Sequence, residues 1–206
     1  MTDRYWQNWD KANIAKEVNN YWDTSAIVTE EAKTLAADIE QELGTRIPIL
    51  EVGCGTGRIY RAILDRHIIT PDLYTGGDVS HKMLDIARTR SPEAKFIDLD
   101  ILNLPYPDKS QPNVICVQVL QHLPHYAQAV DELIRITRER LYIASWFHLG
   151  FKDKIMTEKK TWGAKFHNNH YSLPKFLAFL YSHTGIKSVC IKQLGEPSCS
   201  LTLLLQ

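Results

Sequence analysis

Short apolar runs along the chain alternate with segments whose apolar residues recur every three or four positions. The first pattern is typical of buried strands and the second of amphipathic helices. The expected strands are 49–52, 73–77, 95–98, 113–119, 141–145, 187–194 and 200–205. The expected helices are 29–43, one beginning near residue 57, one following residue 80, one over about 125–138, and 174–183. This alternation predicts an α/β fold built on a doubly wound sheet.

Local signals predict where several of these elements begin and end. Thr29 is the expected N-cap of the first helix, Gly44 is its expected stop, and Ser80 is the expected N-cap of the third. The run 114–117 is apolar throughout, which favours a central parallel strand covered on both faces. Residues 146–172 look irregular, aromatic and rich in histidine and lysine. No repeat or linker interrupts the pattern, so we expect one domain over 1–206.

Charge and composition narrow the choice of partners. Lysine plus arginine and aspartate plus glutamate number 24 each, so the formal net charge is zero. No overall field therefore draws the chain toward nucleic acid or an anionic membrane. The N-terminus lacks the apolar core of a signal peptide, and no apolar run approaches transmembrane length. We expect a cytoplasmic protein that acts as a monomer or a homodimer.

The four cysteines, Cys54, Cys116, Cys190 and Cys199, show no C-x-x-C spacing. The sequence therefore predicts no metal site. Free thiols in a reducing cytoplasm are the expected state. A Cys190–Cys199 disulfide across a hairpin is the alternative.

The strand 49–52 runs into three glycines at alternate positions, Gly53, Gly55 and Gly57. Glycine has no Cβ, so the backbone of such a turn can come close to a ligand. The dinucleotide fingerprint G-x-G-x-x-G needs its third glycine where this chain has Arg58. A nicotinamide oxidoreductase is therefore a disfavoured alternative.

The form Glu51-Val52-Gly53-Cys54-Gly55-Thr56-Gly57 resembles motif I of the class I S-adenosylmethionine-dependent methyltransferases. Three more stations resemble that family in order and spacing: Gly76-Gly77-Asp78-Val79-Ser80 with Met83-Leu84, then Phe96-Ile97-Asp98-Leu99-Asp100-Ile101 with Leu104-Pro105-Tyr106-Pro107-Asp108, then 114–124. The small-molecule enzymes of the "methyltransferase domain 11" type are the most similar. The resemblance implies a three-layer Rossmann-like sandwich with a seven-stranded, mostly parallel sheet of order 3214576, whose last strand is antiparallel.

The chain departs from the family pattern in two places. The Pro-Gly-Gly turn usual before the fifth strand is replaced by Thr137-Arg138-Glu139-Arg140. Leu99 stands where a glycine often precedes the acid of the third station. The first change lies far from the cofactor, and the second bears on the adenine end of its site.

The resemblance implies S-adenosylmethionine as the cofactor and a set of residues around it. These are Glu51, Gly53, Gly55, Gly57, Asp78, Val79, Met83, Asp100, Ile101 and Gln118. The glycines suit the methionine end, where Glu51 would hold the turn or neutralise positive charge. Gln118 would border the crevice at the carboxyl end of its strand.

Asp78 is placed to accept hydrogen bonds from both ribose hydroxyls, and a charge-assisted bond of that kind contributes roughly 1.5–3 kcal/mol. Asp100 would take the adenine amine, with Ile101 packing on the ring and Met83 covering the adenosine. Plainer interpretations remain open. Asp78 could partner the N-cap that follows it, Met83 could be a core residue, and Asp100 could be a solvated acid.

Methyl transfer needs alignment of donor and acceptor and, for some acceptors, a base. The candidates on the acceptor side are His122, His148, His167, His170 and Tyr171. We select His122 as the catalytic residue, because residues at strand ends of this fold face the crevice.

Two aromatic groups accompany these candidates. Trp146, Phe147, Phe151, Trp162, Phe166 and Tyr171 could line an acceptor pocket or form a satellite core. The N-terminal aromatics Tyr5, Trp6, Trp9, Tyr21 and Trp22 resemble the family's lid over the cofactor. We therefore divide the domain into a helical lid (1–44), a cofactor-binding core (45–145) and an acceptor-side segment with the C-terminal strands (146–206).

The predicted function is transfer of a methyl group to an O or N atom, less readily C, of a small molecule. No Asn/Asp-Pro-Pro-Tyr run follows the fourth strand, so amino methylation of DNA bases is disfavoured. The alternatives are an RNA methyltransferase, which the neutral charge disfavours, and a methyltransferase-fold protein that binds the cofactor without turnover.

Overall fold

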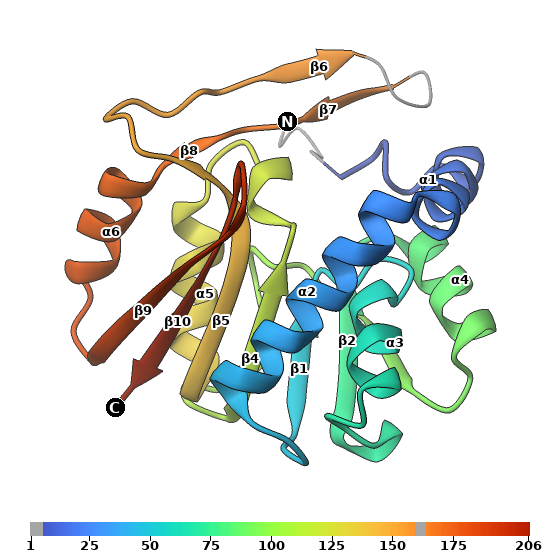
Figure 1. Cartoon of the computed structure of the whole chain (residues 1–206), viewed down its shortest axis with the longest axis horizontal. Helices are drawn as coiled ribbons and strands as arrows, with labels where there is room; N and C mark the ends of the chain where they lie inside the picture. Colours follow the sequence, from blue (N-terminus) through green and yellow to red (C-terminus); the bar gives the residue numbers. More distant parts are fainter. Residues whose placement is uncertain (1–5, 160–163) are drawn as a thin grey trace.

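The computed structural model describes residues 6–159 and 164–206. Its main sheet orders seven strands as β3, β2, β1, β4, β5, β10, β9 (Figure 1). Their bounds, in that order, are Lys95–Asp98, Tyr74–Asp78, Ile49–Val52, Gln111–Val117, Thr137–His148, Ser198–Leu205 and Ile186–Gly195. The first five are parallel, and β10 runs antiparallel to both β5 and β9. The predicted fold and strand order are confirmed.

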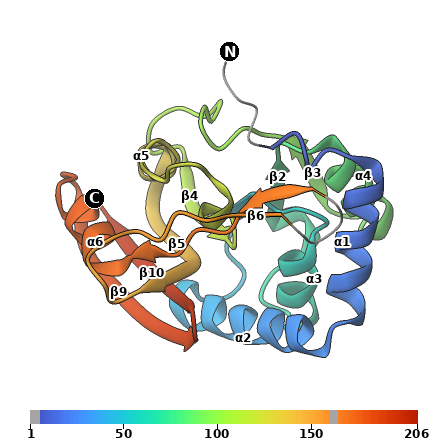
Figure 2. The ribbon, with the colours of Figure 1, turned by 90° about the horizontal axis from the view of Figure 1, so that it is seen from above.

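Helices cover both faces of this sheet (Figure 2). One face packs against α2 (Ala26–Leu43), α3 (Arg58–Asp65) and α4 (His81–Arg90), and the other against α5 (Ala127–Ile136) and α6 (Leu173–Tyr181). Successive side chains of a strand point to opposite faces, so the 114–117 run of β4 feeds both cores. Val114 and Cys116 join the α5–α6 side, whereas Ile115 and Val117 join the α2–α4 side. The central position expected for this strand is confirmed.

The N-terminal part is more helical than expected. The helix expected over 29–43 begins at Ala26, because Ser25 and not Thr29 is its N-cap; the Ser25 hydroxyl accepts a hydrogen bond from the backbone N–H of Val28 at 3.4 Å. Before it lies α1 (Ala12–Thr24), whose buried Ile14 and Val18 pack with Met83 of α4. The helix boundary at Thr29 was therefore wrong.

Several elements differ from the expected ones in extent. The fourth strand ends at Val117 instead of 119. β5 begins at Thr137 and runs on to His148, so the stretch 137–140 belongs to a strand and not to a turn. The segment expected to be irregular contains an antiparallel ribbon, β6 (Thr157–Lys159) with β7 (Lys165–His167), and a short strand β8 (Tyr171–Ser172) parallel to β5. The ribbon crosses above the sheet (Figure 2).

All four cysteines are free thiols. In the β9–β10 pair Cys190 faces Thr202 and Cys199 faces Gln193, so the hairpin does not bring the two cysteines together. Across residues 6–159 and 164–206, no group of three or more His, Cys, Asp or Glu side chains is arranged to hold a metal ion. In the same two stretches, no helix combines the length and the apolar character needed to cross a membrane.

Candidate functional site

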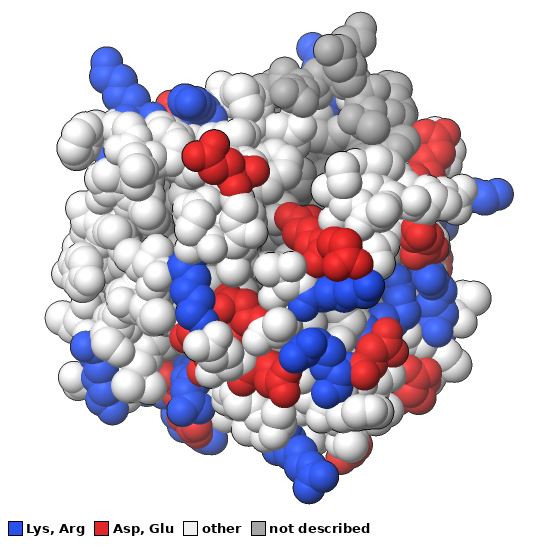
Figure 3. Space-filling model, in the orientation of Figure 1, with Lys and Arg blue, Asp and Glu red and all other residues white. Residues whose placement is uncertain are grey.

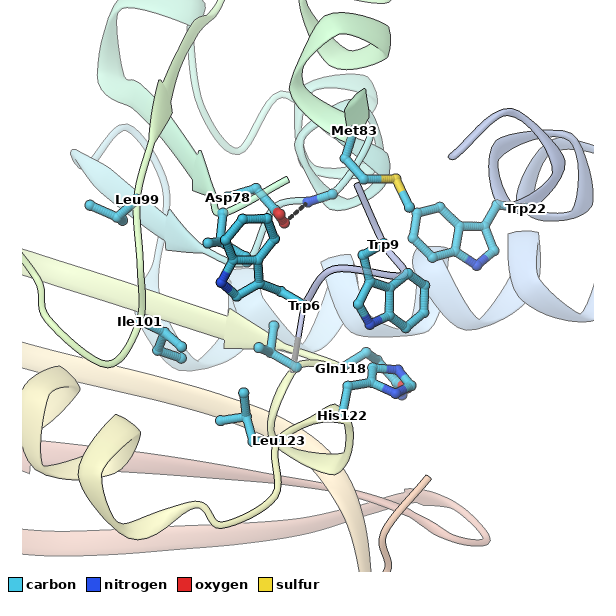
Figure 4. A pocket seen from close by; sticks show the side chains of 14 residues that line it. Trp6, Trp9, Trp22, Asp78, Met83, Leu99, Ile101, Gln118, His122 and Leu123 are labelled. Carbon is cyan, nitrogen blue, oxygen red and sulfur yellow. Dashed lines mark hydrogen bonds between the residues drawn. The ribbon is translucent and has the colours of Figure 1, made fainter. Parts of the chain in front are cut away.

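A cavity of about 690 Å³, including the part open to solvent, lies at the carboxyl ends of β1, β2 and β4 (Figure 4). Ligands of open α/β sheets bind at this edge. The lining residues are Trp6, Trp9, Trp22, Gly53, Gly55, Asp78, Val79, Met83, Leu99, Ile101, Gln118, Val119, His122 and Leu123. Seven of the ten residues that the resemblance placed at the cofactor are among them.

The glycine-rich turn after β1 forms the floor of the cavity, and Gly53 and Gly55 have positive φ angles of 82° and 54°. A Cβ on Gly53 would lie 2.2 Å from Cγ2 of Val119, and one on Gly55 would lie 3.3 Å from the Trp22 ring. Val119 and Trp22 can stand this close to the turn only because Gly53 and Gly55 have no side chains. Gly57 does not line the cavity; it is the N-cap of α3 in the left-handed conformation.

Asp78, at the end of β2, is the carboxylate of the cavity. Oδ2 accepts a hydrogen bond from the backbone N–H of Gly55 at 2.8 Å (Figure 4). Oδ1 accepts one from Ser80 N–H at 2.9 Å. Burial raises the pKa of Asp78, and these backbone donors oppose that rise. A carboxylate has about four lone-pair positions, so these backbone donors leave acceptor capacity for a ligand. Asp78 also has the plainer role of a partner for the start of the next helix, because it accepts a hydrogen bond from Ser80, the N-cap of α4.

Glu51 is buried outside the cavity. It alternates with Leu50 and Val52, which belong to the α5–α6 core, so its side chain points the other way, toward α3. There the Tyr74 hydroxyl donates a hydrogen bond to its carboxylate. Burial raises the pKa of Glu51 to about 8, so the group is largely protonated at neutral pH. Of the two roles expected for Glu51, this position behind the turn favours holding the turn, because the residue does not line the cavity.

The third station contributes apolar side chains to the wall of the cavity and no charged side chain. Leu99 and Ile101 line the cavity, whereas Asp100 does not; its carboxylate accepts a hydrogen bond from the backbone N–H of Leu102 at 2.9 Å. A Cβ on Gly77 would lie 2.4 Å from Cδ2 of Leu99. The leucine that replaces the family's glycine therefore fits against a glycine of the neighbouring strand.

Gln118 follows β4 with a positive φ of 58°. Its Nε2 donates hydrogen bonds to Oε1 of Glu31 at 2.9 Å and to Oγ of Ser198 at 3.3 Å. Its Oε1 accepts one from Nε2 of the buried Gln121 at 2.8 Å. Since these partners belong to three different segments, the side chain has one orientation at the cavity wall.

His122, at the end of η2 (Leu120–His122), faces the same cavity. Its Nδ1 lies 2.7 Å from the carbonyl oxygen of His167, and a carbonyl can only accept, so Nδ1 carries the proton. Burial lowers the pKa of His122 to about 4. The ring packs edge-on against Trp9, with centroids 4.9 Å apart. His122 is thus a neutral imidazole whose Nε2 has an available lone pair.

The other acceptor-side candidates do not line the cavity. His148 accepts a hydrogen bond from Gly150 N–H, and the buried Tyr171 donates one to the carbonyl of Leu123. The ring of His170 packs on Trp146 at 5.4 Å, and the carbonyl of His167 serves as the acceptor for His122.

The aromatic cluster, for which an acceptor pocket and a satellite core were both open, is dispersed. Phe147 and Tyr171 belong to the α5–α6 core, Phe151 is 80% exposed, and Phe166 packs on Trp9 at 4.3 Å. Trp146 lies against His122 at 6.2 Å. The sixth member, Trp162, lies outside the described residues, as does Tyr5 of the N-terminal group.

The N-terminal segment covers the cavity with Trp6, Trp9 and Trp22. It is fastened to α4 at both of that helix's ends. At the first end the Ser80 hydroxyl donates to the Trp9 carbonyl at 2.9 Å, and the Asp10 carboxylate accepts from Lys82 N–H at 3.1 Å. At the other, Arg90 donates to Asn19 and to Asp23 of α1. Sequence reasoning singled out these tryptophans but could not identify Ser80 as their anchor.

Residues 50–144 match the family model described as a methyltransferase domain. Two relatives are 28% identical: 27-O-demethylrifamycin SV methyltransferase of Amycolatopsis mediterranei, with 58% of this chain and 46% of the relative covered, and O-methyltransferase rstn1 of Aspergillus nomiae, with 62% and 61% covered. The chain thus spans about half the length of the curated relatives it matches. A solved complex of DhpI with SAH superposes with a TM-score of 0.72 at 15% identity, covering 97% of this chain and 95% of that one.

The matched segment contains eleven of the fourteen lining residues, among them Asp78, Gln118 and His122. The cavity also fits the cofactor chemically. It offers a turn with two glycines facing the cavity, a carboxylate with acceptor capacity and an apolar wall for an adenine. Residues 50–144 are thus similar to the methyltransferase domain family, and the chain has the fold of the solved complex of DhpI with SAH.

Proposed function

We propose that this protein transfers the methyl group of S-adenosylmethionine to an oxygen or nitrogen atom of a neutral small molecule. The observation that carries the proposal is that Asp78 and His122 face one cavity. Asp78 has lone pairs for a ribose diol, and His122 has one for a proton. The cavity thus combines a donor-binding group with a base on the acceptor side.

Different residues of the cavity bind different parts of the donor. Leu99, Ile101 and Met83 supply an apolar surface for the adenine. Asp78, with Val79 beside it, accepts hydrogen bonds from the ribose. The turn at Gly53 and Gly55 admits the methionine end. When bound, the donor supplies a methyl carbon activated by the sulfonium. Trp6, Trp9 and Trp22 exclude water from it as a lid.

The charges around the cavity favour a neutral acceptor. Among the lining residues, Asp78 and His122 are the titratable ones, and none is lysine or arginine. An anionic acceptor would therefore lose its hydration without gaining a cation in return. A hydroxyl acceptor arrives neutral and releases its proton to Nε2 of His122 as its oxygen bonds to the methyl carbon.

A small molecule fits the surface better than a nucleic acid does. Lysine and arginine are interspersed with aspartate and glutamate on the face shown in Figure 3, so this face presents no continuous basic track. The names of both curated relatives above describe methyl transfer, one of them to a demethylated rifamycin.

The first test is calorimetric titration with S-adenosylhomocysteine, which should bind in the micromolar range. Asp78→Ala should weaken binding at least about tenfold, or about 1.4 kcal/mol. Asp98→Ala is the matched control, because Asp98 pairs with Asp78 in the β2–β3 register but its side chain is 58% exposed and does not line the cavity. An absence of binding to the unmodified chain would refute the proposal.

Turnover is tested separately. The chain is incubated with methyl-labelled donor and a panel of neutral hydroxyl and amino compounds, and labelled products are counted. Product formation excludes a protein that only binds the cofactor. Labelling of carboxylic acids in preference to their neutral counterparts would contradict the argument from charge.

A further inference from the structure

Asn169 lies between β7 and β8, is fully buried, and has no part in the function proposed above. Its backbone N–H donates a hydrogen bond to the carbonyl of Gln121 at 2.9 Å, and its Nδ2 donates one to the carbonyl of Leu123 at 2.8 Å. These two carbonyls stand on either side of His122 in the chain. Asn169 therefore holds the backbone at the end of η2 on both sides of the histidine that faces the cavity.

The same asparagine fastens this turn to the β6–β7 ribbon and to β8. Its Oδ1 accepts a hydrogen bond from the backbone N–H of Met156 at 2.9 Å, just before β6 begins. The Tyr171 hydroxyl of β8 accepts from its Nδ2 at 3.0 Å and itself donates to the carbonyl of Leu123. The ribbon forms a sheet of its own and crosses above the main one (Figure 2). Its position relative to η2 therefore depends on these hydrogen bonds.

The ribbon supplies the atom that orients the His122 ring. Nδ1 of His122 lies 2.7 Å from the carbonyl oxygen of His167, the last residue of β7 and two residues before Asn169. A neutral imidazole carries its proton on one of its two nitrogens, and the partner of one nitrogen decides which. A carbonyl facing Nδ1 keeps the proton there and leaves the lone pair on Nε2. If the ribbon shifts relative to η2, the ring loses this partner and both tautomers become populated.

Asn169 does not line the cavity, so any effect that it has on the reaction passes through its neighbours. We propose that Asn169 is a positioning residue, which holds the His167 carbonyl against His122 and so keeps the His122 ring in the tautomer protonated at Nδ1. The inference rests on the proposed function, in which Nε2 of His122 takes the proton of the acceptor. An asparagine that only tied these segments together would leave the tautomer of the ring unchanged.

Nitrogen NMR on isotope-labelled histidine reads the tautomer without any acceptor or turnover. At neutral pH His122 should show a protonated Nδ1 and an unprotonated Nε2, and the His122→Gln variant identifies this pair of signals among those of the eight histidines. In Asn169→Ala the two nitrogen shifts should move toward each other, as two exchanging tautomers require. Unchanged shifts would overturn the inference.

Tyr171→Phe is a milder variant of the same set of contacts, and it decides the question if Asn169→Ala does not fold. It removes the hydroxyl that contacts both Nδ2 of Asn169 and the carbonyl of Leu123. The nitrogen shifts of His122 should move in the same direction by a smaller amount. If Tyr171→Phe is the variant that folds and its shifts equal those of the unmodified chain, the inference is wrong.

A double-variant cycle shows whether Asn169 acts through His122. Asn169→Ala should lower the single-turnover rate with a hydroxyl acceptor about tenfold and leave the affinity for S-adenosylhomocysteine within about twofold. In the His122→Gln background the same substitution should have no further effect, since the ring that it positions is absent. Equal losses of rate in the two backgrounds would show that Asn169 only supports the fold.

Asn113→Ala is the matched control. Asn113, the third residue of β4, is also buried, and its Nδ2 also donates to a backbone carbonyl, that of Pro48 at 3.2 Å. Its loss should lower the free energy of unfolding but leave the transfer rate and the His122 shifts unchanged. If Asn113→Ala slows transfer as much as Asn169→Ala does, the inference is wrong. If His122→Gln leaves the rate unchanged, the proposed function loses its base, and the tautomer measurement still decides the role of Asn169.

Discussion

Asp78 Oδ2 and the backbone N–H of Gly55 form a 2.8 Å hydrogen bond between the end of β2 and the turn after β1. The carboxylate proposed to bind the ribose therefore also fixes the turn that admits the methionine end. The two ends of the donor site are coupled through one side chain. Asp78→Ala should consequently lower affinity by more than the loss of ribose contacts alone.

Steric crowding at the turn predicts a large effect for Gly53→Ala. The new Cβ would lie 2.2 Å from Val119, and φ is 82°. Gly185 has a similar φ of 94° but no atom within 4 Å of its virtual Cβ, so Gly185→Ala isolates the backbone strain. We expect about 1 kcal/mol of destabilisation at Gly185 and roughly 1–3 kcal/mol more at Gly53. Urea unfolding measures both, and equal effects would contradict the packing at Val119.

Protonation of Glu51 predicts a pH dependence of stability. Its pKa is raised to about 8 from an ordinary value of 4.5. Between these values the unfolded chain binds fewer protons than the native one, so stability falls as pH rises from about 5 to 8. For a group that titrates in this way, the free energy of unfolding falls by at most about 1.4 kcal/mol for each rise of one in pH.

Glu51→Gln removes that titration and keeps a partner for Tyr74. Its free energy of unfolding should therefore vary less between about pH 5 and pH 8 than that of the unmodified chain. Urea titrations at both ends of this range check the prediction. Parallel pH profiles for the two chains would show that Glu51 is ionised in the native state.

Catalysis by His122 predicts a specific pH profile. Because its pKa is lowered to about 4, the imidazole is already neutral at ordinary pH, and the rate should be flat from about pH 6 to 8. His122→Gln should lower the single-turnover rate with a hydroxyl acceptor by about a hundredfold or more. Binding of S-adenosylhomocysteine should change little. A rate that rises with a midpoint near 6.5, the ordinary pKa of histidine, would show that His122 is not the base.

The lid predicts an effect of Trp9 on the lifetime of the complex. Trp9→Ala opens the wall between the cavity and solvent, so dissociation of S-adenosylhomocysteine should accelerate at least about tenfold. Tyr21→Ala is the control, because this aromatic residue of α1 is 49% exposed and does not line the cavity. Stopped-flow displacement gives both rates. Equal dissociation rates in the two variants would show that Trp9 is a core residue and does not act as a lid.

The sheet was readable from the sequence because its strands carry their own signal. β1 and β3 have the predicted bounds, and Ser80 caps α4 as predicted. The β6–β7 ribbon escaped notice because each of its strands has three residues, too short for an apolar alternation to show. Thr29 failed as a cap because Ser25, one turn earlier, occupies that role.

The site was readable where chemistry requires a particular residue type, as at Gly53, Gly55 and Asp78. Val119 and Leu123 escaped notice because an apolar wall residue has the same sequence signal as a core residue. That Glu51 lies outside the cavity could not be predicted, because the direction of a side chain at a strand end depends on which face each neighbour occupies. Asn169 meets the end of η2 only through the packing of segments far apart in the chain.

Trp9 contacts His122 on one side and Phe166 of β7 on the other, and its carbonyl is fastened to Ser80 beside Asp78. Under the proposed function, with the donor at Asp78 and the acceptor at His122, this indole would separate the two substrates. An acceptor resting against it would then trap the donor, so turnover would follow a compulsory order in which the sulfonium compound enters first and its thioether product leaves last.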